Sequence, residues 1–527
     1  MLKRTLSLLD KAPMFWVAVG LGLVIFSVNR MLPEMNWDAV SSEQSVLDQA
    51  FSHNLQQGNW SYHVLPDTPQ TYGAHVLTQY LRAALSIVTG DSGRAGVWLS
   101  LLGITATLCG LYPLSLRIFP LRGFAVITVM CAGALGAIQF SLSTDPSAAI
   151  GTAFVVWGMV FFLTALTKHH PYDIFASGLL FGLAGYIRIE LSMMWVFLAV
   201  YLMVLSIFPP SKKREDTGYV SMALGGVITV LIVLWPMIHR NIQLAGTPIL
   251  PGFDAEIVLG APSLSGQADP ESFVLRLLQG LKILVLNFRG PGIFVGLLWP
   301  IGIVICLLMG RHQKIPYFWL PIVTSMFLCL SALSYVTGFQ SFQESLLILS
   351  PLLLPFAILP LAYALHRWMQ EKTRSPAQCR TVWASAGLGL FLLIQLPHFL
   401  HFAPSGTPEL EQQRVVLVEE FSRLPHQQTS AMLISDTPGT FLTGGKSTVI
   451  GMNGETDWQI LTAKYANGEF QYDKLLAYMK NKQVKFIHLS DVEDPLVDFL
   501  ALEPNAPSIS PVTSFSPPHR VFRVDWL

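Results

Sequence analysis

Long apolar segments alternate with short polar connections over residues 1–403. The first apolar run, residues 12–32, has the length of about 20 residues that crosses the hydrocarbon core of a bilayer. By the same pattern, ten further segments are predicted to span the membrane: residues 95–116, 123–141, 148–166, 174–187, 191–208, 220–238, 293–310, 316–337, 346–365 and 382–402. The sequence therefore predicts a polytopic α-helical membrane protein with about eleven transmembrane helices.

Composition and charge support this prediction and orient the chain. Hydrophobic residues make up 52% of the sequence and charged residues 13%, well below the roughly 25% charge of a typical soluble domain. Lys+Arg and Asp+Glu are equal at 33 each, so no basic surplus indicates a nucleic-acid partner. Basic residues collect in alternate loops, which are typical of the cytoplasmic side. We therefore expect a cytoplasmic N-terminus: Arg117, Arg122, Lys168, Lys212, Lys213, Arg214, Arg311, Lys314, Arg367, Lys372, Arg374 and Arg380 then face inward.

Two of the predicted outer segments are too long to be simple turns. Residues 33–94 contain apolar positions at helical spacing, first over Val40 to Leu55 and again over residues 71–88. Residues 239–289 contain another amphipathic stretch, at 273–286. Such patterns are typical of helices that lie along the membrane surface.

The composition changes after residue 403, where the apolar runs shorten to strand length. Strands are predicted at residues 431–435, 447–452 and 484–489, and helices at 410–424 and 472–482. This alternation predicts a small α/β domain over residues 404–527. An odd number of spans places that domain outside the cytoplasm.

A few charged residues at the predicted outer boundary are candidates for chemistry. Asp38 stands where the first apolar run gives way to an amphipathic helix; it is either a solvated helix cap or a general base, alone or through a metal ion. Arg188 and Glu190 stand between two adjoining apolar runs, where ionisable groups are costly, and the arginine is either structural or anion-binding. His239 and Arg240 form either an interfacial cluster or a phosphate site, for which a guanidinium is suited.

Taken together, these stretches resemble the polytopic GT-C glycosyltransferases, which include protein mannosyltransferases and the aminoarabinose transferase of lipid A. The resemblance depends on the order and side of several short motifs over residues 1–250, none of which is specific alone. They are Asp38 with Leu55 and Gly58; Pro69 with Tyr72; Gly178, Gly182, Leu183 and Arg188; and Trp235, Pro236, Arg240, Asn241, Gly246 and Pro248.

The resemblance implies an inverting transfer of a sugar from a polyprenyl-phosphate donor to a lipid, glycan or protein acceptor at the outer face of a bacterial inner membrane. It implies that Asp38 is the base and that Arg188 and Arg240 bind the lipid phosphate. It also places three further residues beside the substrate, namely Tyr72, Glu190 and His239. The family often has a second carboxylate directly after the first, but Ala39 follows Asp38 here. Asp145 is our candidate for that second carboxylate, with Glu190 as the next candidate, and the need for a divalent metal ion is left open.

Two other classes of function remain as alternatives. A transporter or flippase of a lipid-linked saccharide would share the membrane topology, although such proteins usually show internal repeats and charges near the bilayer midplane. A membrane scaffold that displays the C-terminal domain would not require Asp38, Arg188 and Arg240 on one side. Substitution of Asp38 separates these alternatives from an enzyme.

Overall fold

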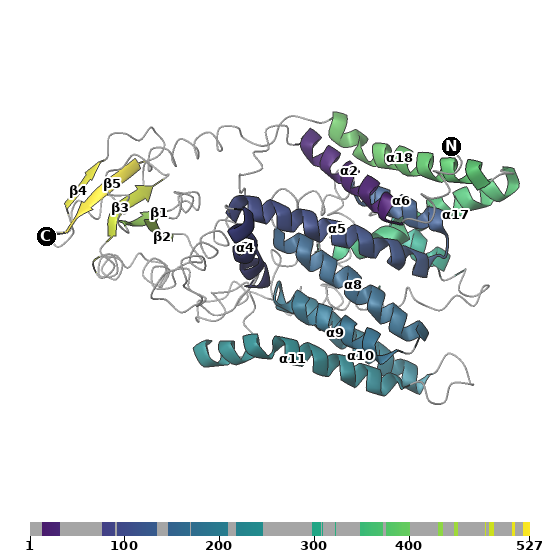
Figure 1. Cartoon of the computed structure of the whole chain (residues 1–527), viewed down its shortest axis with the longest axis horizontal. Helices are drawn as coiled ribbons and strands as arrows, with labels where there is room; N and C mark the ends of the chain where they lie inside the picture. The colour runs from purple at the N-terminus through teal and green to yellow at the C-terminus, as the bar shows by residue number, and fades with distance from the viewer. Residues whose placement is uncertain are drawn as a thin grey trace, which may run out of the picture.

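The computed structural model describes part of the chain: residues 13–31, 76–89, 92–133, 146–168, 170–208, 218–245, 298–306, 308, 322, 348–372, 376–400, 431–435, 447–451, 480, 484–489, 508–511 and 520–526. These residues form a bundle of apolar helices and a separate five-stranded sheet (Figure 1).

Most helices of the bundle coincide with predicted membrane spans. They are α2 (Pro13–Met31), α5 (Ser92–Ile118), α6 (Arg122–Ala132), α8 (Pro146–Lys168), α9 (Pro171–Gly185), α10 (Ile189–Ile207), α11 (Tyr219–Ala245), the 3₁₀ turn η3 (Ser350–Leu353) with α17 (Leu354–Lys372), and α18 (Pro376–Leu400). Residues 298–306 are also helical, within predicted span 293–310. Of predicted span 316–337, the structure describes Ile322 alone, so the total of eleven stays a prediction.

Among the helices that the structure describes, four are long and apolar enough to cross a bilayer: Arg94–Ile118, Pro146–Thr167, Tyr219–His239 and Ser350–Gln370. Large apolar side chains on α10 and α11 face outward, among them Val200, Ile228 and Ile232. A lipid environment makes such exposure favourable. The protein is therefore an integral membrane protein.

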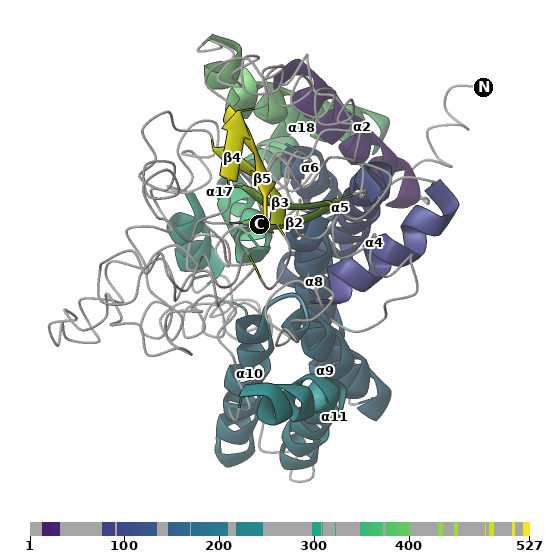
Figure 2. The same ribbon diagram turned by 90° about the vertical axis from the view of Figure 1, so that its left-hand side faces the viewer.

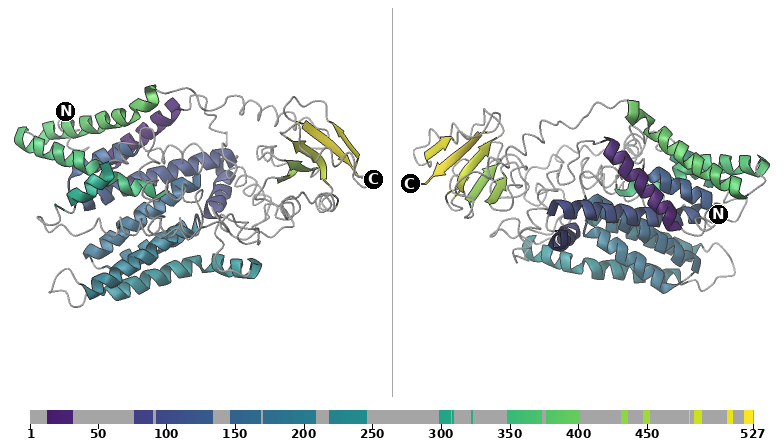
Figure 3. Two further views of the ribbon diagram at one scale, coloured as in Figure 1. Left: turned by 180° about the vertical axis from the view of Figure 1, so that it is seen from behind. Right: turned by 45° about the horizontal axis from the view of Figure 1, so that its top comes forward.

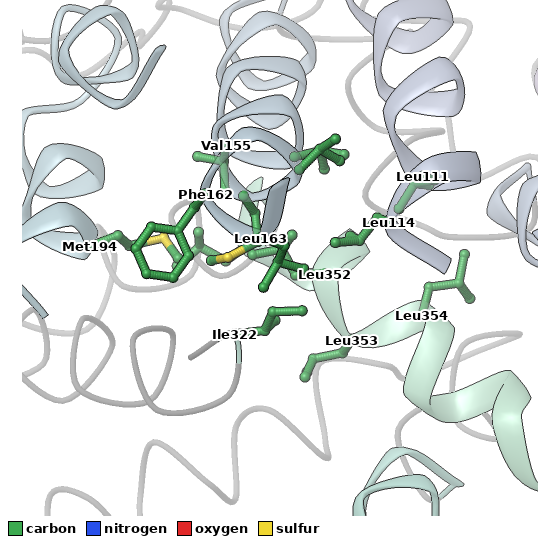
Figure 4. Close-up of a cluster of buried hydrophobic side chains, with 14 of the residues drawn as sticks. Leu111, Leu114, Val155, Phe162, Leu163, Met194, Ile322, Leu352, Leu353 and Leu354 are labelled. Atoms are coloured by element: carbon green, nitrogen blue, oxygen red, sulfur yellow. The ribbon is translucent and has the colours of Figure 1, made fainter. Parts of the chain in front are cut away.

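Small residues and apolar side chains hold the helices together. A Cβ atom added at Gly182 of α9 would lie 2.8 Å from Cβ of Val233 on α11, so the missing side chain lets the two helices approach closely. Further along the bundle, a continuous apolar core joins α5, α8, α10 and the η3–α17 segment. Figure 4 shows this core around Leu111, Phe162 and Leu352, all of which are fully buried.

Helix α4 (Val76–Thr89) runs across the ends of α5 and α8 (Figures 1 and 2). Its presence confirms the helix predicted within residues 71–88. Side chains of Leu77, Leu81 and Leu85 pack against a small cluster formed by Leu99 of α5, Ile150 of α8 and Ile187. We use "the α4 end" for this end of the bundle, where α5, α8 and α10 begin and where α9 and α11 finish.

The C-terminal sheet has the order β2-β1-β3-β5-β4. Strands β1 (Ala431–Ser435), β2 (Ser447–Gly451) and β3 (Val484–Leu489) are parallel and match the predicted strands. Strands β4 (Ser508–Pro511) and β5 (Arg520–Asp525) were not predicted; β5 pairs with β3 in antiparallel fashion, and β4 pairs with β5 in the same way. The sheet lies beyond the α4 end of the bundle (Figure 3). Predicted helix 410–424 lies outside the described residues, as does 472–482 except for Lys480.

Candidate functional site

A short non-helical segment, residues 186–188, separates α9 from α10. Arg188 is the last residue of this segment, which we call the break. Helix α9 ends at Gly185, and Arg188 is the residue before α10, with an extended backbone (φ −150°, ψ 121°). Its backbone N–H donates to the carbonyl oxygen of Ala184 at 2.9 Å. The residue is 2% exposed. Arg188 is therefore a buried cation outside the regular helices.

Three neighbouring elements fix the break in place. The hydroxyl of Tyr186 donates to the carbonyl oxygen of Val233 on α11 at 2.9 Å. The backbone N–H of Leu77, near the start of α4, donates to the carbonyl oxygen of Tyr186 at 3.5 Å. Ile187 is fully buried against Ile150 of α8. The backbone that carries Arg188 is thus attached to α4, α8 and α11 together.

The electrostatics of the α4 end favour an anion. Helices α5, α8 and α10 all begin here, and each helix N-terminus carries the equivalent of about half a positive charge. Arg188 occupies the N-cap of α10 without a capping hydrogen bond from its side chain, at a position where Ser, Thr, Asp and Asn are preferred. A cation there adds to the positive helix end, which an anion would offset. Glu190 is the second residue of α10, where a carboxylate is favourable; its side chain lies outside the described set.

Helix α4 contributes a strip of buried polar side chains that sequence reasoning missed. Thr78, Gln79, Arg82 and Ser86 are each 3% exposed or less, whereas Ile87 and Val88 are 72% and 82% exposed. The polar side of this amphipathic helix therefore faces the protein, and part of its apolar side faces outward. The signal was present in the sequence, because Thr78, Arg82 and Ser86 recur every four residues and so share one helix face.

The guanidinium of Arg82 lies directly against α5. A Cβ atom added at Gly96 would be 2.9 Å from Nη2 of Arg82, 3.1 Å from its Cζ and 3.3 Å from its Nε. Glycine at position 96 therefore provides the space that the guanidinium occupies. Since α5 starts at Ser92, this cation also lies near a helix N-terminus.

His239 and Arg240 lie inside α11, because the helix continues to Ala245. The part of α11 that is apolar enough to span the membrane is Tyr219–His239, which agrees with the predicted span 220–238, and the helix continues beyond it. The exposed imidazole of His239 is tilted over the ring of Trp235, with centroids 6.0 Å apart, as in an aromatic cluster at a membrane interface. The side chain of Arg240 lies outside the described set.

The remaining predicted site residues, Asp38, Tyr72 and Asp145, lie outside the described residues. Asp145 directly precedes Pro146, the first residue of α8, and hence the positive end of that helix. Among the described residues there is no group of three metal-ligating side chains. The carboxylates and the metal ion thus stay predictions.

The helix bundle with its broken α9–α10 connection and crossing α4 has the fold of the polytopic GT-C glycosyltransferases. Among solved structures, ArnT, the aminoarabinose transferase from Cupriavidus metallidurans, matches in its apo state with a TM-score of 0.62 and 12% identity over 97% of this chain and 97% of that chain. The same enzyme bound to undecaprenyl phosphate matches with a TM-score of 0.60 over 97% and 98%.

A second similar structure is the archaeal oligosaccharyltransferase AglB from Archaeoglobus fulgidus in complex with an inhibitory peptide and a dolichol-phosphate. It matches with a TM-score of 0.52 and 13% identity over 93% of this chain and 71% of that chain. No family model matches the sequence, and no curated protein does so either. The likeness lies in the fold, and it confirms the GT-C resemblance inferred from the motifs.

Proposed function

We propose that this protein is an inverting glycosyltransferase that moves a sugar from a polyprenyl-phosphate donor to an acceptor at the outer face of the membrane. The observation that carries the proposal is the buried Arg188 at the N-terminus of α10. A buried cation on a positive helix end suits a phosphate, and Arg can bind phosphate through two parallel hydrogen bonds. The structural neighbours that were solved with undecaprenyl phosphate and with dolichol-phosphate support the same class of donor.

In the proposed reaction, Asp38 accepts the proton of the acceptor hydroxyl as that oxygen attacks the anomeric carbon. The new C–O bond forms on the face opposite the phosphate, and the bond from the anomeric carbon to the phosphate oxygen breaks. The electron pair stays on the departing polyprenyl phosphate, whose added negative charge Arg188 stabilises. Asp145 is the proposed second carboxylate. Carboxylates are the usual ligands of Mg²⁺ and Ca²⁺, so Asp38 and Asp145 are the residues that would hold a divalent metal ion.

We place the α4 end on the extracytoplasmic side of a bacterial inner membrane, with the N-terminus in the cytoplasm. Arg117 and Lys168, near or at the opposite ends of α5 and α8, then face the cytoplasm as the positive-inside rule requires. The sheet lies at the α4 end (Figure 1), and we propose that this domain is extracytoplasmic.

The test compares the wild type with Asp38→Asn and with Glu43→Gln, a nearby carboxylate in the same segment, as the matched control. Purified proteins receive a panel of polyprenyl-phosphate hexoses and pentoses and a membrane extract as acceptor, and released polyprenyl phosphate is measured by mass spectrometry. We expect release from one donor by the wild type and by Glu43→Gln, and a loss of about 100-fold or more in Asp38→Asn. Repeating the assay with a chelator tests the metal ion.

Other results would contradict the proposal in distinct ways. Equal release by wild type and Asp38→Asn would remove Asp38 from the mechanism. If folded wild type released nothing from any donor but moved a lipid-linked saccharide between leaflets of a vesicle, the protein would be a flippase.

A further inference from the structure

We propose that Arg82 of α4, together with the hydroxyl of Thr78, forms a second anion-binding element that holds a phosphate oxygen of the polyprenyl-phosphate substrate. This inference rests on the proposed function and assigns to it two residues that the motifs did not indicate. The substrate group that it names is the phosphate monoester or diester at the end of a polyprenyl chain.

Burial of Arg82 is the first observation. The residue is 1% exposed on a short helix at the end of the bundle, where an arginine could reach water if α4 were rotated by half a turn. Instead, α4 exposes Ile87 and Val88 and turns its cation inward. A guanidinium that is turned inward exchanges its hydration for contacts with acceptors, and a phosphate oxygen is a suitable further acceptor because its geometry matches the planar guanidinium.

Thr78 is the second and independent observation. Its side chain is fully buried, and its Oγ1 has no hydrogen-bond partner among the described residues. Buried hydroxyls are nearly always hydrogen-bonded. Thr78 precedes Arg82 by four residues and so lies on the same face of α4. A phosphate oxygen that accepts from the guanidinium is therefore in a position to accept the Thr78 O–H as well.

The surroundings of the guanidinium favour a bound anion rather than a further cation. Arg82 lies on Gly96, in the second turn of α5, so it shares the positive potential of that helix start. Leu77 and Leu81 attach α4 to the break that carries Arg188. The two buried arginines thus belong to elements in direct contact at the α4 end.

The experiment measures binding of undecaprenyl phosphate, without sugar, to the full-length protein in detergent. The variants are Arg82→Lys, Arg82→Gln and Thr78→Val, and the matched control is Arg94→Gln, an exposed arginine on α5. We expect binding to weaken roughly 10- to 100-fold in both Arg82 variants, because a charge-assisted hydrogen bond is lost or misdirected, and roughly 2- to 10-fold in Thr78→Val. Arg94→Gln should bind as the wild type does. Inorganic phosphate at the same concentration serves as a second probe, and competition by it supports recognition of the phosphate itself.

A purely structural role for Arg82 predicts a different result. In that case Arg82→Lys and Arg82→Gln lower the unfolding temperature without ligand, while the folded fraction binds undecaprenyl phosphate as tightly as the wild type; that outcome overturns the inference. Thr78→Val keeps the shape of the side chain, so it remains informative if the Arg82 variants fail to fold, and unchanged binding would then overturn the inference. If the wild type binds and turns over its donor and the variants do the same, this inference alone is refuted. If the wild type neither binds undecaprenyl phosphate nor turns over any donor, the proposed function is refuted.

Discussion

Gly96→Ala should weaken catalysis by displacing the guanidinium of Arg82. The added Cβ would lie 2.9 Å from Nη2, and ordinary contact begins at 3.4 Å, so the guanidinium must move by at least about 0.5 Å. Displacement of a binding group by 1 Å can cost about 100-fold in rate. We therefore expect kcat/KM to fall by about 10-fold. Alanine is also favoured over glycine inside a helix by up to about 1 kcal/mol. The free energy of unfolding should therefore change little while kcat/KM falls.

The assay is release of polyprenyl phosphate at subsaturating donor, with the unfolding temperature measured in parallel. Gly389→Ala is the matched control, because no atom lies within 4 Å of a Cβ added there on α18. In an Arg82→Gln background, Gly96→Ala should have little further effect, since the two changes then act on one contact and are not additive. If Gly96→Ala matches Gly389→Ala in activity, or adds its full effect in the Arg82→Gln background, the reasoning is refuted.

Two further predictions concern the helix contacts that fix the break. Gly182→Ala should lower the free energy of unfolding by about 1–3 kcal/mol, since its Cβ would meet Val233; Gly225→Ala, whose Cβ has its nearest neighbour at 3.6 Å, should not. Tyr186→Phe loses the hydrogen bond to α11 and should lower the free energy of unfolding by about 0.6–1 kcal/mol. Tyr172→Phe, at an exposed position, should leave it unchanged. Unfolding in detergent followed by fluorescence checks both, and equal effects in variant and control would contradict them.

Most of the bundle could be predicted from the sequence because a lipid-spanning helix needs only length and apolar composition. Even the short predicted span 174–187 corresponds to a helix, α9 (Pro171–Gly185). Composition does not locate helix ends at the membrane surface, where α11 continues past His239 to Ala245. It also does not show which strands pair. Strand β5 was missed because its partner β3 lies earlier in the chain, and β4 because its only partner is β5, so neither strand has a strong local signal.

The sequence likewise indicated one arginine of the candidate site, Arg188, and not the other, Arg82. Arg188 could be found because a charge between two apolar runs is costly wherever the backbone goes, and the structure places it at a helix break. Arg82 was missed because α4 is amphipathic, and the usual reading of an amphipathic helix turns the charged side toward water. Which side faces the protein depends on contacts such as those of Arg82 with Gly96, between residues on different helices, and no local pattern reveals them.

The arrangement of these arginines has a thermodynamic consequence. Arg188 and Arg82 are each buried near the N-terminus of a helix, where the helix dipole opposes a cation. An anion bound beside both arginines therefore gains their attraction and also offsets the unfavourable interaction of each cation with the helix dipole. Binding to the native state alone stabilises it by RT ln(1 + [L]/Kd), which is about 2.7 kcal/mol at a ligand concentration 100 times Kd. Polyprenyl phosphate should therefore raise the unfolding temperature, and this increase should shrink in Arg82→Lys and Arg188→Lys, because a lysine retains the charge but lacks the planar fork that a phosphate requires.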